Sequence, residues 1–214
     1  MKEEKKFSIA KEGAPIIIPV LFLALVLNIL GYKTGSYFFS LLGILIVLFF
    51  RAPGRVISKD EHIIVSPADG KVIAVEDDTE DLFMHEKTRR ISIFLSIFNV
   101  HINRIPMAGE VKYFDYKKGQ FVIAYHEKAY LLNEQNIIGI ENKKIKYLFR
   151  QITGLIARRV VFNGRVGDFF ETGEKFGLMK FGSRMDVYLP RTVKILVKKG
   201  DIVKGGITVI GEVS

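Results

Sequence analysis

Apolar residues dominate two runs near the N-terminus, one from Ala14 to Leu30 and one from Ser36 to Phe50. Lys33, in the short break between the runs, is the only charged residue of this region. Each run is slightly short for a hydrocarbon core of about 30 Å, which needs roughly 20 helical residues. The pattern therefore predicts an α-helical membrane hairpin over residues 14–50, made of two short transmembrane helices or of a re-entrant pair.

The flanks of these runs help to distinguish a retained hairpin from a cleaved signal peptide. Residues 1–13 form a polar tail with several lysines, which a signal peptide would also have. No small-x-small cleavage site ends the first run, however, and the second run follows at once, so we favour the hairpin. Basic residues lie outside both runs, including Arg51 and Arg55, whereas the connection carries only Lys33. The positive-inside rule then places both ends, and the domain that follows, on the cytoplasmic face of the cell membrane.

Residues 51–214 show the two-residue alternation of β-strands and frequent glycine turns, with few segments of helical period. Ile91 to Phe98 alternates in this way, and Ile63 to Val75 is predicted as two strands joined by an Asp-Gly hairpin turn. Short strands with glycine turns are typical of a small barrel or sandwich. The predicted fold is therefore mainly β, a small barrel or sandwich that follows the α-helical membrane hairpin.

A glycine-serine pair, Gly182-Ser183, interrupts a strand-like segment near the C-terminus. The residues on both sides, from Gly177 to Pro190, otherwise suit a half-buried pleated strand. Glycine weakens a strand unless the backbone bends or another group approaches closely. A serine hydroxyl directly after a bent peptide can reach the carbonyl carbon of the preceding glycine, which is the geometry of an internal N→O acyl shift. The alternative is a β-bulge without chemistry.

Polar side chains also appear where predicted strands end. His101 and Asn103 share one face of an extended chain, and the pair Asn133-Glu134 closes an apolar run. Asp69 lies in the predicted Asp-Gly turn, where turn formation alone explains an aspartate. A lone histidine at a strand end is more often structural than catalytic. The polar company of His101 in an otherwise apolar strand favours a chemical role.

Composition narrows the chemistry open to these residues. The chain has no cysteine, which excludes disulfides, thiolate metal sites and a thiol nucleophile, and no metal site is predicted. The formal net charge of +9 indicates an anionic partner, either a nucleic acid or a membrane surface. The sequence shows no Walker loop, helix-turn-helix spacing or RNA-binding signature. We therefore expect a membrane partner and no nucleic acid.

Four segments of this chain occur in the same order in a known family. They are Ser66-Pro-Ala-Asp69-Gly70, Phe94 to Pro106 around His101, Asn133-Glu134, and Lys175-Phe-Gly-Leu-Met-Lys-Phe-Gly182-Ser183-Arg184. The chain thus resembles the phosphatidylserine decarboxylase proenzymes, in their short archaeal and bacterial-type form. The resemblance begins near Arg55 and continues to the C-terminus, and an N-terminal membrane segment also fits it.

The resemblance implies a self-processing enzyme whose catalytic domain spans residues 51–214. Ser183 would attack the Gly182 carbonyl, and β-elimination from the ester would leave a large chain, 1–182, and a small chain, 183–214. The residue at position 183 would become a covalent pyruvoyl group, the cofactor of the family. Its carbonyl would condense with the amino group of phosphatidylserine and draw electrons as CO2 leaves, which yields phosphatidylethanolamine.

The resemblance assigns Ser183, His101 and Asp69 to catalysis, residue by residue. His101 would transfer protons, and Asp69 would orient or charge it. Longer bacterial relatives carry a second histidine three positions after the first, where this chain has Arg104. Either His101 serves both self-cleavage and decarboxylation, or another group substitutes for the second histidine.

Four further residues are candidate substrate ligands. Arg104 and Arg184 suit the carboxylate or phosphate of a phospholipid, with solvated surface charge as the alternative. Asn133 and Glu134 are the other two, because they form one of the shared segments. Predicted partners are the membrane phospholipid and the two chains of one precursor, and a homo-oligomer is compatible with the sequence.

Two other functions fit parts of the sequence. Val197 to Ile210 resembles the turn-and-strand pattern of biotinyl/lipoyl-like sandwich domains, and Val166 to Gly177 is a similar earlier copy. A non-enzymatic membrane-anchored adaptor would show these repeats, but it gives no reason for the aspartate, histidine and Gly-Ser segments together. A pyruvoyl-dependent decarboxylase of a soluble amino acid is the closer rival. The membrane hairpin and the positive charge argue against it, because they suit an anionic lipid surface.

Overall fold

A computed structural model of the chain describes residues 2–3, 7–120, 122, 124, 129–154, 160–179 and 182–213. The chain divides into two compact units, one formed by Glu4–Gly54 and the other by Met1–Glu3 with Arg55–Ser214.

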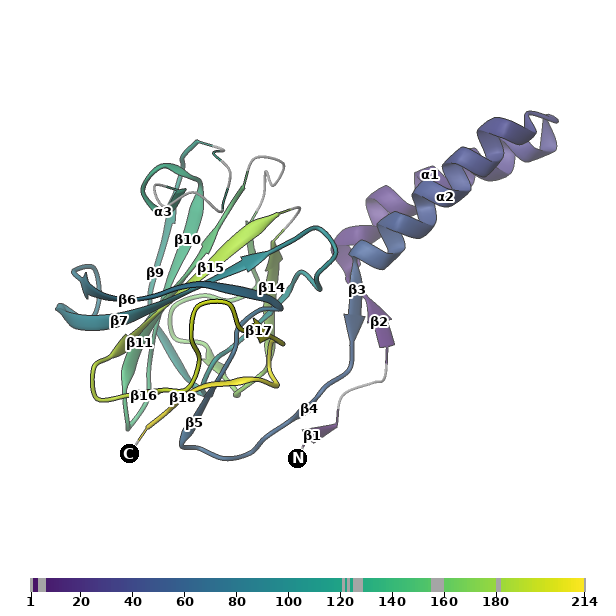
Figure 1. The fold of residues 1–214 in the computed structure, drawn as a ribbon. Coiled ribbons are helices and arrows are strands. Elements are labelled where there is room, and N and C mark those ends of the chain that lie inside the picture. Colours follow the sequence, from purple (N-terminus) through teal and green to yellow (C-terminus); the bar gives the residue numbers. More distant parts are fainter. Residues whose placement is uncertain are drawn as a thin grey trace. The chain divides into compact units, whose positions relative to one another are not determined.

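The smaller unit is a helical hairpin (Figure 1). A 3-10 turn, Lys11–Gly13, leads into α1 (Ala14–Ile29), and α2 (Lys33–Phe49) follows after a short connection. Gly43 permits close packing of the two helices, because a Cβ there would lie 2.4 Å from Cδ2 of Leu21. At the base of the hairpin, β2 (Phe7–Ile9) pairs antiparallel with β3 (Arg51–Pro53). The predicted N-terminal helical hairpin is confirmed.

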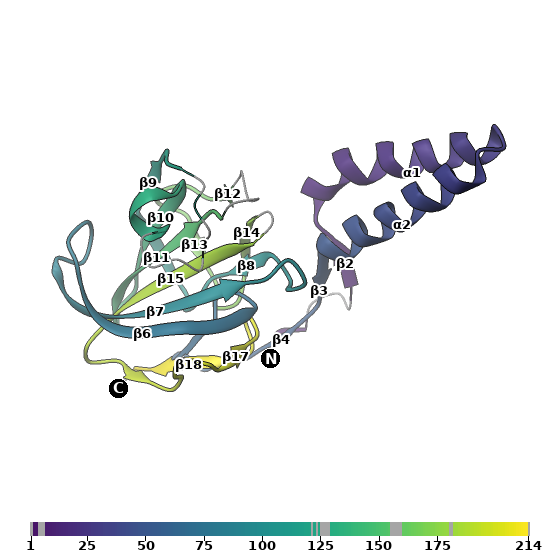
Figure 2. The same ribbon diagram turned by 45° about the horizontal axis from the view of Figure 1, so that its top comes forward.

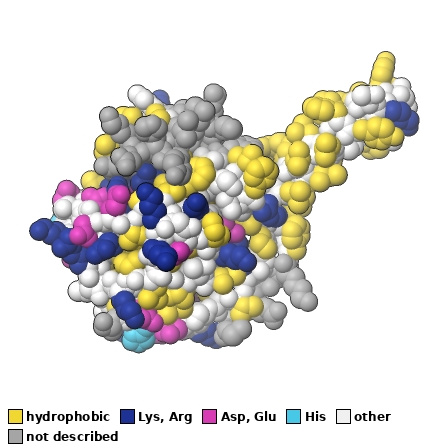
Figure 3. Space-filling view, in the orientation of Figure 1, with side chains coloured by type: hydrophobic (Ala, Val, Ile, Leu, Met, Phe, Trp, Pro, Cys, Tyr) yellow, Lys and Arg dark blue, Asp and Glu magenta, His cyan; other side chains and the backbone are white. Residues whose placement is uncertain are grey.

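The hairpin exposes an apolar surface. Residues Lys11–Ile29 form a helical stretch of 19 residues that is long and apolar enough to cross a membrane, while the helix Lys33–Phe49 is shorter. Hydrophobic side chains cover most of the visible surface of this hairpin (Figure 3). A contiguous apolar surface is unfavourable in water and marks a membrane or protein contact. The helix therefore favours membrane association, while its depth and the cytoplasmic orientation stay predictions.

The larger unit is built on an antiparallel eight-stranded sheet with the strand order β13-β9-β10-β11-β15-β7-β6-β17. Its strands are β6 (Gly70–Glu80), β7 (Glu86–Leu95), β9 (Gly109–Lys117), β10 (Gln135–Glu141), β11 (Lys146–Ile152), β13 (Phe169–Phe170), β15 (Ser183–Pro190) and β17 (Ile202–Val203). This sheet curls into a half-barrel (Figures 1 and 2). The middle of the sheet, where β15 lies between β7 and β11, is consequently enclosed.

Smaller sheets complete this unit. One has the order β12-β14-β8 and another the order β16-β18-β5, while β1 pairs with β4. Their strands, with the short helix of this unit, are β1 (Lys2–Glu3), β4 (Val56–Ile57), β5 (Ile63–Val65), β8 (Ile102–Arg104), α3 (Ala129–Leu132), β12 (Val160–Phe162), β14 (Lys175–Met179), β16 (Lys194–Ile195) and β18 (Val209–Glu212).

One large apolar core lies on the inner face of the eight-stranded sheet. Alternate residues of β15, such as Met185 and Val187, join it together with alternate residues of β7, such as Ile91 and Ile93. Because side chains alternate across a strand, the intervening residues of β7 and β15 lie on the outer face. The two-residue period read from the sequence therefore orients these strands correctly, and the prediction of a mainly β domain is confirmed.

The expected hairpin around the Asp-Gly pair is wrong. β5 pairs with β18, whereas β6 pairs with β7 and β17, so the two strands flanking the turn enter different sheets. A Cβ on Gly70 would lie 2.2 Å from the carbonyl oxygen of Phe94. Glycine is therefore needed here for the close approach of two strands and not for a two-residue turn.

Candidate functional site

The Gly182-Ser183 pair lies where the chain enters the middle of the large sheet. Ser183 begins β15 and pairs with Leu95, the last residue of β7, while Arg184 pairs with Ile152 at the end of β11. Gly182 has a φ of +59°, in the left-handed region that favours glycine, although no atom of the described residues lies within 4 Å of a Cβ placed there. The backbone thus bends directly before Ser183, and the preference for glycine is conformational and not steric.

The Ser183 side chain is enclosed. It is fully buried on the same face of β15 as the core residue Met185, and its Oγ has no hydrogen-bond partner within the described part of the chain. A buried hydroxyl without a partner costs about 1–3 kcal/mol, and such groups are uncommon in native proteins. A hydroxyl in this state beside a bent peptide suits a nucleophile whose target is the chain itself.

Backbone pairing brings His101 to the same end of the sheet. The loop that joins β7 to β8 starts after Leu95, which is the strand partner of Ser183. At the other end of this loop, the His101 carbonyl accepts a hydrogen bond from the Met179 N–H of β14 at 3.2 Å. The loop is therefore tied to the chain on both sides of residues 180–182.

A local turn holds the His101 ring. Oδ1 of Asn99 accepts hydrogen bonds from the N–H of Ser96 at 2.8 Å and from its hydroxyl at 2.9 Å. The Asn99 carbonyl oxygen lies 2.9 Å from Nδ1 of the buried His101 ring. Because a carbonyl oxygen only accepts, Nδ1 carries the proton of the neutral ring and Nε2 carries the lone pair. Nε2 is therefore the atom through which His101 can accept a proton.

Asp69 lies immediately before β6, at the same edge of the sheet. Its carboxylate forms an ion pair with Arg55, with 2.7 Å between Oδ1 and Nη1, and accepts a hydrogen bond from the Gly205 N–H at 2.8 Å. Among the described residues, its polar contacts are these two, and no hydrogen bond joins it to His101. β7 separates β6 from β15, so the backbones of Asp69 and Ser183 are about 10 Å apart. The structure thus brings Asp69 near the candidate nucleophile but not into contact with the imidazole.

Both candidate arginines are buried and are not solvated surface charges. Arg104 donates a hydrogen bond from Nη1 to the Gly173 carbonyl at 2.7 Å. Arg184 donates from Nε to Asp186 at 2.6 Å and from Nη2 to the Ser92 hydroxyl at 2.9 Å. As the next residue after Ser183 on a strand, Arg184 faces the opposite side of the sheet.

Asn133 and Glu134 connect neighbouring backbone segments. Nδ2 of Asn133 donates to the carbonyls of Val122 and Thr153, each at 2.7 Å, while its Oδ1 accepts from the Val122 N–H at 2.8 Å. The Glu134 carbonyl accepts hydrogen bonds from both the N–H and the hydroxyl of Thr153 at 3.0 Å. Both residues therefore hold Thr153 in place just after β11, and substrate contact for them stays a prediction.

Three buried amides lie beside the inner face of β15, and of these only Asn103 was singled out by its sequence pattern. Nε2 of Gln151 donates to Oδ1 of Asn103 at 2.8 Å, and Nδ2 of Asn136 donates to Oε1 of Gln151 at 2.9 Å. Nδ2 of Asn103 has no hydrogen-bond partner in the part of the chain that the structure describes. Gln151 is the strand partner of Met185, two residues along β15 from Ser183, which places the amides near the hydroxyl.

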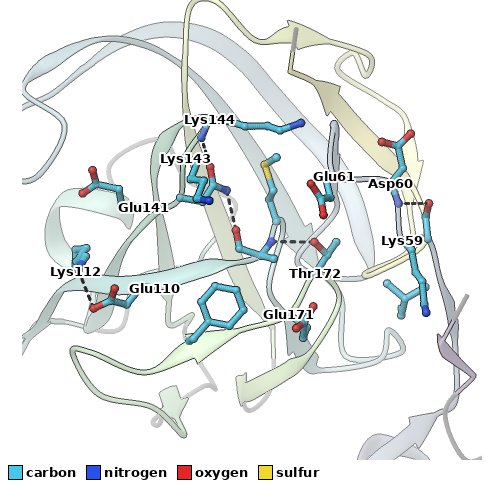
Figure 4. A pocket seen from close by; sticks show the side chains of 16 residues that line it. Lys59, Asp60, Glu61, Glu110, Lys112, Glu141, Lys143, Lys144, Glu171 and Thr172 are labelled. Atoms are coloured by element: carbon cyan, nitrogen blue, oxygen red, sulfur yellow. Dashed lines mark hydrogen bonds and ion pairs between the residues drawn. The ribbon is translucent and has the colours of Figure 1, made fainter.

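A separate cavity of about 980 Å³ opens at the other end of the sheet. Figure 4 shows lysines and carboxylates around it, some of them paired, as Lys112 is with Glu110 at 2.8 Å. Glu141 also lines the cavity and is the last residue of β10. Gln135, the first residue of β10, pairs with the last residue of β11, which is at the end of the sheet where the candidate site lies. The described residues that line this cavity include none of the predicted site residues. The cavity is therefore separate from the candidate site.

Comparison with known proteins points to one family. A family model described as phosphatidylserine decarboxylase matches residues 42–211. Relatives named phosphatidylserine decarboxylase proenzyme include one from Geotalea uraniireducens, 41% identical over 97% of both chains, and one from Carboxydothermus hydrogenoformans, 43% identical over 95% of both chains. Another, from Symbiobacterium thermophilum, is 38% identical over 99% of this chain and 98% of its own. The similarity therefore includes the N-terminal helices as well as the β-rich unit.

Proposed function

The chain belongs to the phosphatidylserine decarboxylase family, and we propose that it forms its own pyruvoyl cofactor by cutting itself between Gly182 and Ser183. The observation that carries this proposal is the left-handed bend at Gly182 directly before a fully buried Ser183 hydroxyl, which lacks a partner in the described structure. The relatives' printed name, proenzyme, is consistent with processing into two chains.

In the proposed reaction, Ser183 Oγ attacks the carbonyl carbon of Gly182. The hydroxyl proton passes to Nε2 of His101, the C–N bond between residues 182 and 183 breaks, and the amine that leaves takes up a proton. The product is an ester. Loss of the α-proton of residue 183, with departure of the Gly182 carboxylate, then cuts the chain and leaves a dehydroalanine. Addition of water and loss of ammonia convert that residue into the pyruvoyl group.

The residues around position 183 fit such a group. Pairing of β15 with both β7 and β11 would keep the new end of the small chain, 183–214, in place after cleavage of the large chain, 1–182. The pyruvoyl group supplies an electron-accepting carbonyl for loss of CO2 from an amino acid carboxylate. Buried apolar neighbours such as Leu95 and Met185 exclude water, which favours loss of the carboxylate charge. His101 would return a proton through Nε2.

Asp69 has a different partner from the one expected. Its ion pair with Arg55 and its bond to the Gly205 N–H join residues that would belong to the large and small chains after cleavage. Arg55 also donates to the Gly205 carbonyl. We therefore propose that Asp69 holds the two chains together at the site and acts on the chemistry through its charge. His101 then serves both reactions, since Arg104 occupies the position of the second histidine.

Among the candidate substrate ligands, Arg104 is better placed than Arg184. It lies on β8, three residues after His101, whereas Arg184 faces the outer side of the sheet with Asp186. The proposed substrate is the head group of phosphatidylserine in a membrane that also holds the N-terminal helices. We further propose that the two glycine-turn segments are related repeats, because β13 and β17 join the large sheet while β14 and β18 join three-stranded sheets.

Intact mass spectrometry under denaturing conditions tests the cleavage. We expect two chains divided between Gly182 and Ser183, the smaller one lighter by one ammonia than a fragment that begins with serine. Borohydride reduction should add two hydrogens to the small chain and abolish activity. An active preparation that consists only of full-length, unmodified chain would contradict the proposal.

Substrate class is tested with the same preparation. We expect CO2 release from vesicles that contain phosphatidylserine, and none from phosphatidylcholine vesicles or from free serine. CO2 release from a soluble amino acid alone would favour the rival decarboxylase. A correctly cut protein that releases no CO2 from either substrate would contradict the proposed substrate while leaving the self-cleavage intact.

A further inference from the structure

Gly154, two residues after the end of β11, lies against the carbonyl that Ser183 would attack. A Cβ placed on Gly154 would lie 2.0 Å from the carbonyl oxygen of Gly182 and 3.1 Å from its carbonyl carbon. Real Cβ atoms essentially never approach another atom within 3.0 Å, and the obstacle here is backbone and not a flexible side chain. Any side chain at position 154 would therefore displace the Gly182-Ser183 peptide.

Hydrogen bonds fix the backbone on which Gly154 depends. The N–H and hydroxyl of Thr153 both donate to the Glu134 carbonyl at 3.0 Å, and its carbonyl accepts from Nδ2 of Asn133 at 2.7 Å. Ala124 closes another side, since its Cβ would lie 3.2 Å from a Cβ on Gly154. All the polar groups of Thr153 are thus engaged, and they define where the next residue lies.

The Gly182 carbonyl needs such support. Gly182 has a left-handed φ that few other residues adopt, and no described residue occupies the space where its own side chain would be. A glycine with open space around it rotates easily unless its peptide is held from outside. Attack on a carbonyl requires the reacting atoms to be held about 3–3.5 Å apart with correct alignment, and small misplacements are costly.

We propose that Thr153 and Gly154 form a backbone shelf that positions the Gly182 carbonyl for attack by Ser183. Asn133 and Glu134 then act as positioning residues that hold the shelf, and not as substrate ligands. This inference rests on the proposed self-cleavage, and it gives the Asn-Glu segment a role in making the cofactor.

The test compares Gly154→Ala with Gly109→Ala. Gly109 begins β9 at the opposite end of the sheet, and a Cβ there would lie 2.6 Å from Ile140 and 2.8 Å from the Glu141 carbonyl oxygen. Both substitutions thus press against backbone at an end of the large sheet, but only Gly154→Ala presses against the carbonyl under attack. Full-length chains are made by cell-free translation, and intact mass is followed with time, with thermal unfolding as the check on folding.

We expect Gly154→Ala to slow cleavage about 100-fold and Gly109→Ala to leave the cleavage rate near wild type at a similar loss of Tm. Hydroxylamine, which cuts the ester, should release much less of the two fragments from Gly154→Ala than from wild-type chain at early times. Decarboxylation per pyruvoyl group should fall far less than the cleavage rate, because the Gly182 carbonyl has left the peptide by then.

Cleavage of folded Gly154→Ala at the wild-type rate would overturn the shelf, and so would equal slowing of both glycine variants. If Gly154→Ala does not fold, Thr153→Val carries the test, because it removes only the hydroxyl bond to Glu134. We expect cleavage about fivefold slower for that variant, and a wild-type rate would overturn the inference. A wild-type chain that never cuts would instead overturn the proposed function.

Discussion

The two faces of β15 carry opposite kinds of buried polar chemistry. On the inner face, Ser183 is followed by Met185 and Val187 of the core, and its Oγ has no partner in the described structure. On the outer face, Arg184 and Asp186 form an ion pair at 2.6 Å whose side chains are almost completely buried. Consecutive residues of one strand therefore supply the proposed nucleophile and a structural ion pair.

The outer face continues this pairing across the sheet. Arg90 on β7 bonds to Glu76 at 2.7 Å, and the Arg150 guanidinium on β11 lies 4.9 Å from the centre of the Tyr188 ring. Buried charge is tolerated where it is paired, so these contacts are what a stable sheet requires. The comparison teaches that burial alone does not identify the site. Single atoms such as Arg150 Nε and Asp186 Oδ2 also lack a hydrogen bond in the described structure, but their side chains are otherwise paired. The informative group is Ser183, because the one polar atom of its side chain is buried without a partner among the described residues.

Replacing Ser183 on the inner face should have the largest effect. Ser183→Ala removes the nucleophile, so we expect no cleavage, no pyruvoyl group and no CO2 release, with the free energy of unfolding unchanged or slightly higher. Ser92→Ala is the matched outer-face control, because it deletes the hydroxyl that accepts from Arg184. That variant should cut normally and lose about 1–2 kcal/mol of stability. Intact mass and urea unfolding measure both; a cut and active Ser183→Ala protein would contradict the mechanism.

His101→Gln should come next in size. The amide keeps hydrogen bonding but cannot take up a proton, so we expect cleavage to slow by about 10²–10⁴-fold. His62→Gln is the control, since His62 is exposed and contacts Lys144 at the surface. Time courses of intact mass check both variants. Equal cleavage rates for His101→Gln and wild type would remove this histidine from the proposed mechanism.

Local patterns predicted the parts of the site that a single strand determines. Two-residue alternation predicted that His101 and Asn103 share one face, although His101 lies in the loop just before β8, and the glycine before Ser183 indicated the bend. The alternation also implied that Arg184 faces away from Ser183. The prediction of Arg184 as a substrate ligand rested on its charge and did not take this orientation into account. Strand period therefore constrains a site more firmly than residue type does.

Contacts between distant segments could not be read from local patterns. Gly154 touches Gly182 only because β11 and β15 are neighbours, and nothing in the residues around position 154 indicates that pairing. The same holds for Asp69, whose turn chemistry suggested a hairpin while its partners are Arg55 and Gly205. Partner choice depends on how the sheet curls, which is a property of the whole chain.

Breaking the outer ion pair tests whether Arg184 is structural. Arg184→Met leaves Asp186 buried without its partner, so we expect a loss of about 3–5 kcal/mol in the free energy of unfolding. The double variant Arg184→Met/Asp186→Leu should recover most of that loss. Urea unfolding measures stability, and vesicle assays of the double variant measure KM for phosphatidylserine. A strongly raised KM in the stable double variant would indicate that Arg184 contacts the substrate. The outer face of β15 would then not be purely structural.

The smallest expected effect concerns Tyr188, on the outer face. Burial raises the pKa of its hydroxyl to about 12, with Arg150 opposing the shift. The unfolded chain releases this proton near pH 10, so the stability contribution of neutral Tyr188 is present below pH 10 and is lost as pH rises through about 12. As the pH rises from 10 to 12, the free energy of unfolding should therefore fall less for Tyr188→Phe than for the chain that retains Tyr188.

This comparison is best made in the uncut Ser183→Ala chain, where one chain unfolds. Burial also raises the pKa of Tyr147 above its ordinary range, so the Tyr188→Phe chain still loses stability at alkaline pH. The diagnostic quantity is therefore the difference in the free energy of unfolding between the chains with and without Tyr188. Urea unfolding at a series of alkaline pH values gives that difference. If the free energy of unfolding depends on pH in the same way for both chains, Tyr188 is exposed to solvent. The outer face would then be less buried than the inner face.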